Sequence, residues 1–107
     1  MLGFFGGFDL SEELELEKLR DEIAKVTLEI FNLCRERIEL SKKIALVKSR
    51  RMLPIEDLEV EESLKRRLLS FCRENNLDEE FCTKLFNLLI CESKRVQNNV
   101  MKTIRQT

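Results

Sequence analysis

The chain has 107 residues, with 19 Lys and Arg against 20 Asp and Glu, a formal net charge of −1 and no His. Such a balanced charge argues against a nucleic-acid partner, and no apolar run approaches the roughly 20 residues that a membrane-spanning helix requires. Three Gly and one Pro leave too few turn residues for an all-β fold. With 43% hydrophobic and 36% charged residues, the composition predicts one small all-α domain made of amphipathic helices.

The chain starts with an apolar segment, residues 1–10, which contains Phe4, Phe5 and Phe8 among glycines. It has no basic flank, so it does not resemble a signal peptide. We expect residues 1–10 to form an arm, and residues 11–107 to form the helical domain.

A long first helix is predicted from Ser11, a hydroxyl cap followed by acidic residues, to about Arg51, because Pro54 follows shortly. Its apolar residues recur at alternating steps of four and three, a coiled-coil-like seam over about four heptads. The seam consists of Leu19, Ile23, Val26, Ile30, Leu33, Leu40, Ile44 and Val47, with Arg37 interrupting it.

A helix of this length measures about 60 Å at 1.5 Å per residue, more than the diameter of a compact domain of this size. Part of its apolar seam therefore needs a cover that the chain itself does not provide, since exposed apolar surface costs about 25 cal/mol per Å². We expect a homodimer in which two long helices pair.

Two further helices are predicted, from about Asp57 to Asn75 and from the N-cap Asp78 to about Thr103. The fold class is therefore all-α with three helices per chain, one of them very long. The expected inner positions are Leu64, Leu68, Phe71 and Cys72 on the second helix, and Cys82, Leu85, Phe86, Leu89, Ser93, Val96 and Val100 on the third. The four cysteines form no CxxC motif, and we expect buried reduced thiols rather than a disulfide.

Polar residues interrupt or flank these apolar stripes. They come in pairs on one helix: Arg37 and Lys48, Asp57 and Glu61, Ser93 and Gln97. Four of them have a simpler explanation when taken alone, namely a register-setting Arg, a capping Asp, a small packing Ser and a solvated Gln. Because unpaired buried charge is costly, their convergence on one interior would indicate a ligand site.

Five segments together resemble the all-helical AroQ class of chorismate mutases. They are LRDEI at 19–23, RERIELSKKIALVK at 35–48, PIED at 54–57, NNLDEEFCTKLFNLLI at 75–90 and ESKRVQ at 92–97. The resemblance implies an intertwined homodimer that converts chorismate to prephenate in aromatic amino acid biosynthesis. It also implies that the reaction needs no cofactor and no metal. We expect this protein to be cytoplasmic. The positions where this class contacts its ligand are Arg20, Arg37, Lys48, Asp57, Glu61, Ser93 and Gln97.

By the same resemblance, Arg37 and Arg20 bind the substrate carboxylates, and Lys48 and Gln97 donate to the ether oxygen. Arg20 lies 17 residues before Arg37, about 25 Å along a helix, so it would have to come from the second subunit.

One position departs from the family, which usually has an Arg where this chain has Val60. Arg50 and Arg51 are candidates for replacing that cation. Two alternatives stay open, an isochorismate-pyruvate lyase of the same fold and a non-catalytic helical dimer that serves as a scaffold or regulatory partner.

Overall fold

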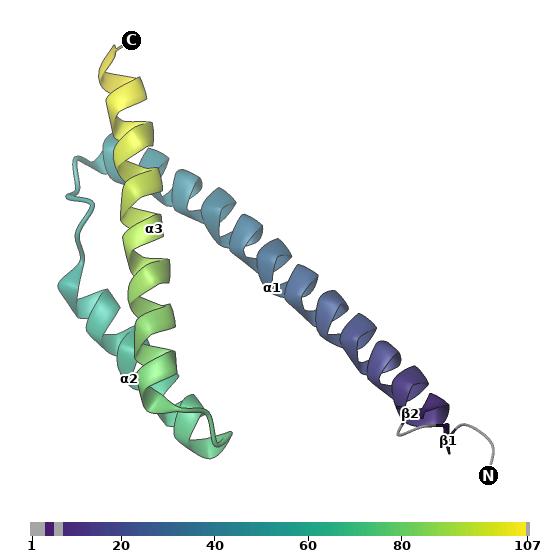
Figure 1. The fold of residues 1–107 in the computed structure, drawn as a ribbon. Coiled ribbons are helices and arrows are strands. Elements are labelled where there is room, and N and C mark those ends of the chain that lie inside the picture. Colours follow the sequence, from purple (N-terminus) through teal and green to yellow (C-terminus); the bar gives the residue numbers. More distant parts are fainter. Residues whose placement is uncertain (1–3, 6–7, 107) are drawn as a thin grey trace. The chain divides into compact units, whose positions relative to one another are not determined.

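The computed structural model describes residues 4–5 and 8–106, and their main elements are three helices (Figure 1). The helices are α1 (Leu10–Arg51), α2 (Leu58–Glu74) and α3 (Glu79–Gln106). They divide into an N-terminal unit that ends at Arg35 and a C-terminal unit that begins at Glu36, and each is described by itself. Within the described residues, none of the helices combines the length and apolar character that crossing a membrane requires.

The N-terminal unit contains a short hairpin and the first part of α1. Strands β1 (Phe4–Phe5) and β2 (Phe8–Asp9) pair antiparallel. The Asp9 carboxylate then accepts hydrogen bonds from the backbone N–H of Ser11 at 3.0 Å and of Glu12 at 3.4 Å. The predicted cap was Ser11, and this was wrong: Asp9 caps the helix, which therefore begins at Leu10.

The predicted apolar seam of α1 is exposed within the single chain. In the C-terminal unit, Leu40 is 56% and Ile44 46% exposed, whereas the small residues Ser41 and Ala45 are buried. The seam positions of the N-terminal unit are exposed as well: Leu19, Ile23, Val26, Ile30 and Leu33. The chain therefore packs α1 through its small residues and leaves the heptad seam uncovered.

The end of α1 turns the chain back toward Lys48. Met52 adopts a left-handed conformation with φ 57°, and the N–H of Leu53 donates to the Lys48 carbonyl at 2.8 Å. A second bond joins the Met52 N–H to the Ser49 carbonyl at 3.3 Å. This pair of bonds is a Schellman motif, and Pro54 prevents the helix from continuing.

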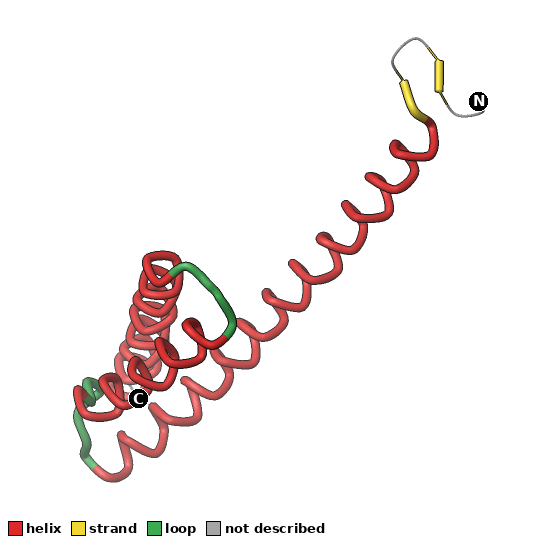
Figure 2. Tube along the Cα trace, turned by 90° about the horizontal axis from the view of Figure 1, so that it is seen from below, coloured by secondary structure: helices red, strands yellow, loops and turns green. Residues whose placement is uncertain are grey.

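Helices α2 and α3 form a hairpin joined by a short loop (Figure 2). The Asp57 carboxylate accepts from the N–H of Val60 at 3.2 Å, and that of Asp78 accepts from the N–H of Phe81 at 2.9 Å. Both predicted caps are confirmed. The predicted ends are confirmed for α2, whereas α3 runs to Gln106, three residues beyond the predicted Thr103.

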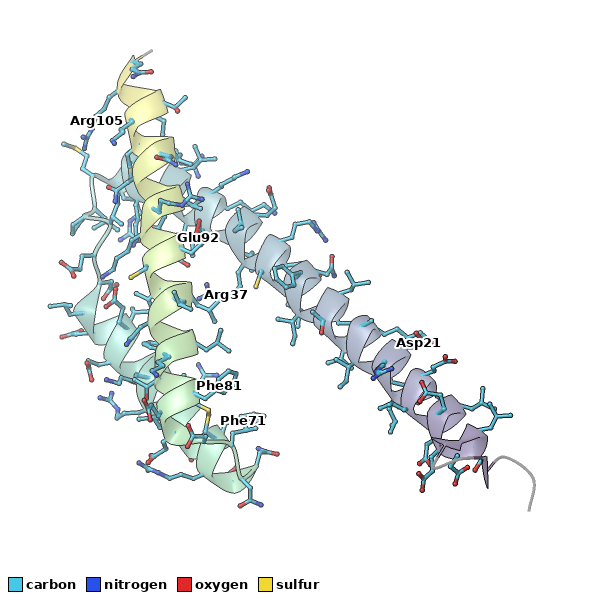
Figure 3. All side chains as sticks on the ribbon, in the orientation of Figure 1. Asp21, Arg37, Phe71, Phe81, Glu92 and Arg105 are labelled. Atoms are coloured by element: carbon cyan, nitrogen blue, oxygen red, sulfur yellow. A yellow bond between two sulfur atoms is a disulfide. The ribbon has the colours of Figure 1, made fainter. Side chains whose placement is uncertain are left out.

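The hydrophobic residues that the C-terminal unit buries are few, and several are small. They are Ala45, Cys72, Cys82, Phe86, Val96 and Met101. Phe71 and Leu85 were predicted to face inward and are 56% and 40% exposed. Figure 3 shows Phe71 and Phe81 near the turn between α2 and α3. The prediction that Phe71 and Leu85 are buried is therefore wrong for the single chain, which provides no surface that covers them.

The prediction of reduced thiols was wrong for two of the four cysteines. Cys72, at the end of α2, and Cys82, at the start of α3, are buried and form a disulfide. The turn between the helices brings the two side chains together from ten positions apart. Cys34 and Cys91 are free, and Cys91 is exposed rather than buried.

Candidate active site

A cavity of about 430 Å³ lies in the C-terminal unit, between the last turns of α1, the α1–α2 loop, α2 and α3. Its volume is in the range typical of small-molecule sites. Six of the seven predicted site residues line it. They supply polar groups on a wall that is otherwise mostly aliphatic. The lining residues are Arg37, Leu40, Ser41, Ile44, Lys48, Ile55, Asp57, Val60, Glu61, Leu64, Ile90, Ser93, Lys94 and Gln97.

Arg37 extends from α1 to α3, where it contacts only uncharged acceptors. Its Nη1 donates to the Leu89 carbonyl at 3.2 Å and to Ser93 Oγ at 3.0 Å. Ser41 Oγ donates to the same hydroxyl oxygen at 3.1 Å. No carboxylate of the described residues forms an ion pair with Arg37, so its charge is available to an anionic ligand.

Lys48, about two turns of α1 beyond Ser41, also contacts only uncharged acceptors. Its Nζ donates to the Ile55 carbonyl at 2.5 Å and to Gln97 Oε1 at 3.3 Å. Gln97 is only 7% exposed, so the simpler explanation of a solvated glutamine is wrong. Since its oxygen accepts from Lys48, the amide nitrogen of Gln97 is the group left to donate to a ligand.

The two predicted carboxylates occupy different environments. Asp57 is exposed and caps α2, as its simpler explanation stated, while it also lines the cavity. Glu61, one turn further, is half-buried and pairs with Lys94 Nζ at 2.8 Å. The acids can therefore accept hydrogen bonds from a ligand hydroxyl, although Glu61 shares its charge with a cation.

Lys94 and Ser41 line the cavity but were missed in the sequence. Lys94 follows Ser93 on α3 and pairs with both Glu61 and Glu56, at 2.8 and 3.2 Å. These hydrogen bonds, with that to Glu61 the stronger cause, raise the pKa of Lys94 above its ordinary 10.5. The signal in the sequence that marks Lys94 is its charge directly beside the inner stripe of α3.

Val60 lines the cavity at the position where the resembling family has an Arg. Arg50 and Arg51, the candidates for replacing that cation, are exposed and do not line the cavity. Among the described residues, Lys94 is the additional cation at this site.

Arg20 is the predicted site residue that the cavity does not include. It lies in the N-terminal unit with a 65% exposed side chain, and its Nη1 is 4.0 Å from Glu13 Oε1. The cavity itself combines three cations, Arg37, Lys48 and Lys94, with the acids Asp57 and Glu61 on apolar walls. This arrangement suits a small anionic ligand with an apolar ring.

Comparison with known proteins identifies the family. The family model for type II chorismate mutases matches residues 19–98, which include every predicted site residue. The chain belongs to the type II chorismate mutase family.

Curated relatives agree with this assignment. The chain is 32% identical to a chorismate mutase of Methanocaldococcus jannaschii over 88 residues, which cover 82% of this chain and 89% of that relative. It is 32% identical to a 4-amino-4-deoxychorismate mutase of Streptomyces venezuelae over 86% of this chain and 89% of the relative. It is also 36% identical to a bifunctional chorismate mutase/prephenate dehydratase of Buchnera aphidicola, over 78% of this chain but 22% of that protein. No solved structure matches the chain significantly.

Proposed function

We propose that this chain rearranges chorismate to prephenate, a step of aromatic amino acid biosynthesis, in a homodimer with two equivalent sites. The observation that carries the proposal is the pair Arg37 and Lys48, two cations that face one cavity and contact only uncharged acceptors. The substrate is a dianion, and a pericyclic rearrangement needs no base, so the absence of His is no obstacle.

Substrate binding is the first contribution of the site. Arg37 and the partner subunit's Arg20 hold the two carboxylates through charge-assisted hydrogen bonds, and the Ser93 hydroxyl adds a further contact. Holding both groups selects the compact conformer in which the reacting carbons lie close together. The substrate thus loses conformational entropy on binding, and the entropy cost of reaching the reactive geometry no longer adds to the activation barrier.

Transition-state stabilisation is the second contribution. As the carbon–oxygen bond breaks, negative charge gathers on the ether oxygen. Lys48 and the Gln97 amide donate to that oxygen, so their interaction strengthens as the charge develops. Glu61 and Asp57 accept from the ring hydroxyl and orient the ring.

The homodimer is supported by the exposed seam of α1. Leu40, Ile44 and Val47 are all more than 40% exposed, and they continue the heptad pattern of the N-terminal unit. A second copy that pairs antiparallel would cover these side chains and bring its own Arg20 to the cavity. The cytoplasm is the location we propose for this dimer, on the grounds of the sequence alone.

Product analysis tests the reaction. We expect the purified protein to consume chorismate and release prephenate in equal amounts. Release of pyruvate and a benzoate from isochorismate would instead indicate the lyase, and turnover of neither compound would indicate the scaffold.

Mixed dimers test the shared site. Arg20→Ala and Lys48→Ala homodimers are each expected to be nearly inactive. Co-refolding them in equal amounts gives half mixed dimers, and each of these regains one intact site of two, which is roughly a quarter of wild-type activity. A site made of one chain alone would show no recovery. Sedimentation of each variant checks that the dimer persists.

A second candidate is the 4-amino-4-deoxychorismate mutase reaction. Similarity to the Streptomyces venezuelae relative is as high as to the chorismate mutase, at 32% identity in both cases. The two substrates differ at one ring position, hydroxyl against amino group, so the carboxylate-binding residues do not distinguish them.

A further inference from the structure

One of the three cations at the cavity, Lys94, already forms ion pairs with carboxylates of the same chain. Lys94 Nζ lies 2.8 Å from Glu61 Oε1 and 3.2 Å from Glu56 Oε1, with 32% of its side chain exposed. Arg37 and Lys48 contact only neutral oxygen atoms. Lys94 therefore differs from them in function, because it acts on the charge of another cavity residue.

The residue on which Lys94 acts is Glu61. The Glu61 side chain is 23% exposed, and with Asp57 it makes up the acidic side of the cavity. Without Lys94, two carboxylates would offset the charges of Arg37 and Lys48, and the cavity would have no net positive charge. With Lys94, one positive charge remains for a dianionic ligand.

We propose that Lys94 determines which ring substituent the site accepts: by neutralising Glu61, it favours a neutral hydroxyl over an ammonium group. This inference rests on the proposed function, which places the substituted ring carbon beside Glu61. The paired carboxylate still accepts a hydrogen bond from a hydroxyl through its second oxygen. An ammonium group at the same place would lie beside the Lys94 ammonium, and like charges repel.

The hydrogen bonds to Glu61 and then Glu56 raise the pKa of Lys94 above its ordinary 10.5, in keeping with these two ion pairs, and the ammonium is protonated throughout the neutral range. The Asp57 carboxylate accepts from the backbone N–H of Val60 and stands outside the Lys94 ion pairs. The preference therefore depends on the pair of Lys94 with Glu61.

The test compares two substrates on three proteins. Lys94→Met removes the charge at similar length, and Lys94→Arg keeps it. We expect Lys94→Met to lower kcat/KM for chorismate about ten-fold, mostly through KM, and to shift the preference toward 4-amino-4-deoxychorismate by a factor of ten or more. Lys94→Arg should stay near the wild-type preference. Equal losses for both substrates would overturn the inference.

Glu56→Gln is the matched control. It removes the negative charge that pairs Lys94 with the α1–α2 loop and leaves the pair with Glu61 in place. If Lys94 merely anchored the loop, Glu56→Gln would reproduce the Lys94→Met kinetics. We expect it to leave the substrate preference unchanged. Should Lys94→Met fail to fold, as judged by circular dichroism, Lys94→Gln takes its place.

Calorimetric titration with both compounds separates this inference from the proposed function. If the wild type binds chorismate without converting it, the proposed function fails, while the ratio of the two dissociation constants in wild type and Lys94→Met still decides the role of Lys94. If the wild type binds neither compound, both are overturned.

Discussion

Arg37 Nη1 donates to Ser93 Oγ at 3.0 Å and so joins α1 to α3 across 56 residues of sequence. Figure 3 shows Arg37 on the side of α1 that faces α3. Because Ser41 donates to the same oxygen, both lone pairs of the Ser93 hydroxyl are used. Its single O–H is therefore the part of Ser93 that can donate to a ligand.

Replacement of this serine gives the first prediction. Ser93→Ala should raise KM for chorismate about ten-fold, since a neutral donor to a carboxylate is lost, and leave kcat within about three-fold. Ser41→Ala is the control, because it keeps the Ser93 hydroxyl. Steady-state kinetics on both variants decide the matter, and equal effects would show that the hydroxyl serves packing only.

Lys48 carries the second prediction. Lys48→Ala should reduce kcat about 10²–10³-fold, because a charged donor to the developing oxyanion is removed. Lys43→Ala, an exposed lysine of α1 that does not line the cavity, should keep wild-type kcat. Sedimentation must give the same mass for both variants. A Lys48→Ala enzyme of wild-type rate would disprove the assigned role.

The dependence on pH is the third prediction. Gln97 does not titrate, and the pKa of Lys94 is raised above 10.5 by Glu61 and Glu56, so the rate should be nearly flat between pH 6 and 8. A steep loss within that window would contradict the assignment.

The same pKa shift has a consequence for stability. A raised folded-state pKa means that the folded protein holds the Lys94 proton more tightly. The stabilisation is therefore complete below about pH 10.5, and it is lost as the pH rises through the higher folded value. Urea unfolding of wild type and Lys94→Met should differ at pH 8 and converge at alkaline pH.

How much the sequence predicts depends on whether the signal is local. The caps Asp57 and Asp78 could be found because a capping side chain bonds to the backbone two or three residues away. At the first helix, the side chains of both Asp9 and Ser11 are able to cap. Only the structure shows that the Asp9 carboxylate accepts the hydrogen bonds from the first backbone N–H groups. The polar positions that interrupt an apolar stripe were visible for the same reason, since a helix fixes which residues share a face.

Features that depend on contact between two helices could not be predicted from the pattern of either helix alone. Lys94 became part of the site through Glu61 on another helix, and Cys72 met Cys82 because the turn placed two helix ends together. The exposed Phe71 shows a further limit. Periodicity identifies an apolar face, but it does not say whether the same chain or another molecule covers that face.

The disulfide provides the fourth prediction. Closing a loop of ten positions should stabilise the fold by about 2–3 kcal/mol through the entropy of the unfolded chain. Urea unfolding at fixed protein concentration, with and without reductant, should show this difference in wild type and none in a Cys72→Ala/Cys82→Ala double variant. Cys91→Ala, which removes a free thiol, should behave as wild type. Equal stability of reduced and oxidised wild type would mean that the bond does not constrain the unfolded chain.

The turn after α1 provides the fifth prediction. Met52 holds φ at 57° and is 91% exposed, so it adopts the unfavourable left-handed conformation without compensating packing contacts. Met52→Gly should therefore raise the free energy of unfolding by about 0.5–1 kcal/mol. Asn76, at φ 55°, ends α2 in the same motif, but asparagine tolerates this conformation, so Asn76→Gly should change stability by at most a few tenths of a kcal/mol. Chemical unfolding of both variants at one protein concentration measures the difference. A Met52→Gly variant less stable than wild type would contradict this prediction.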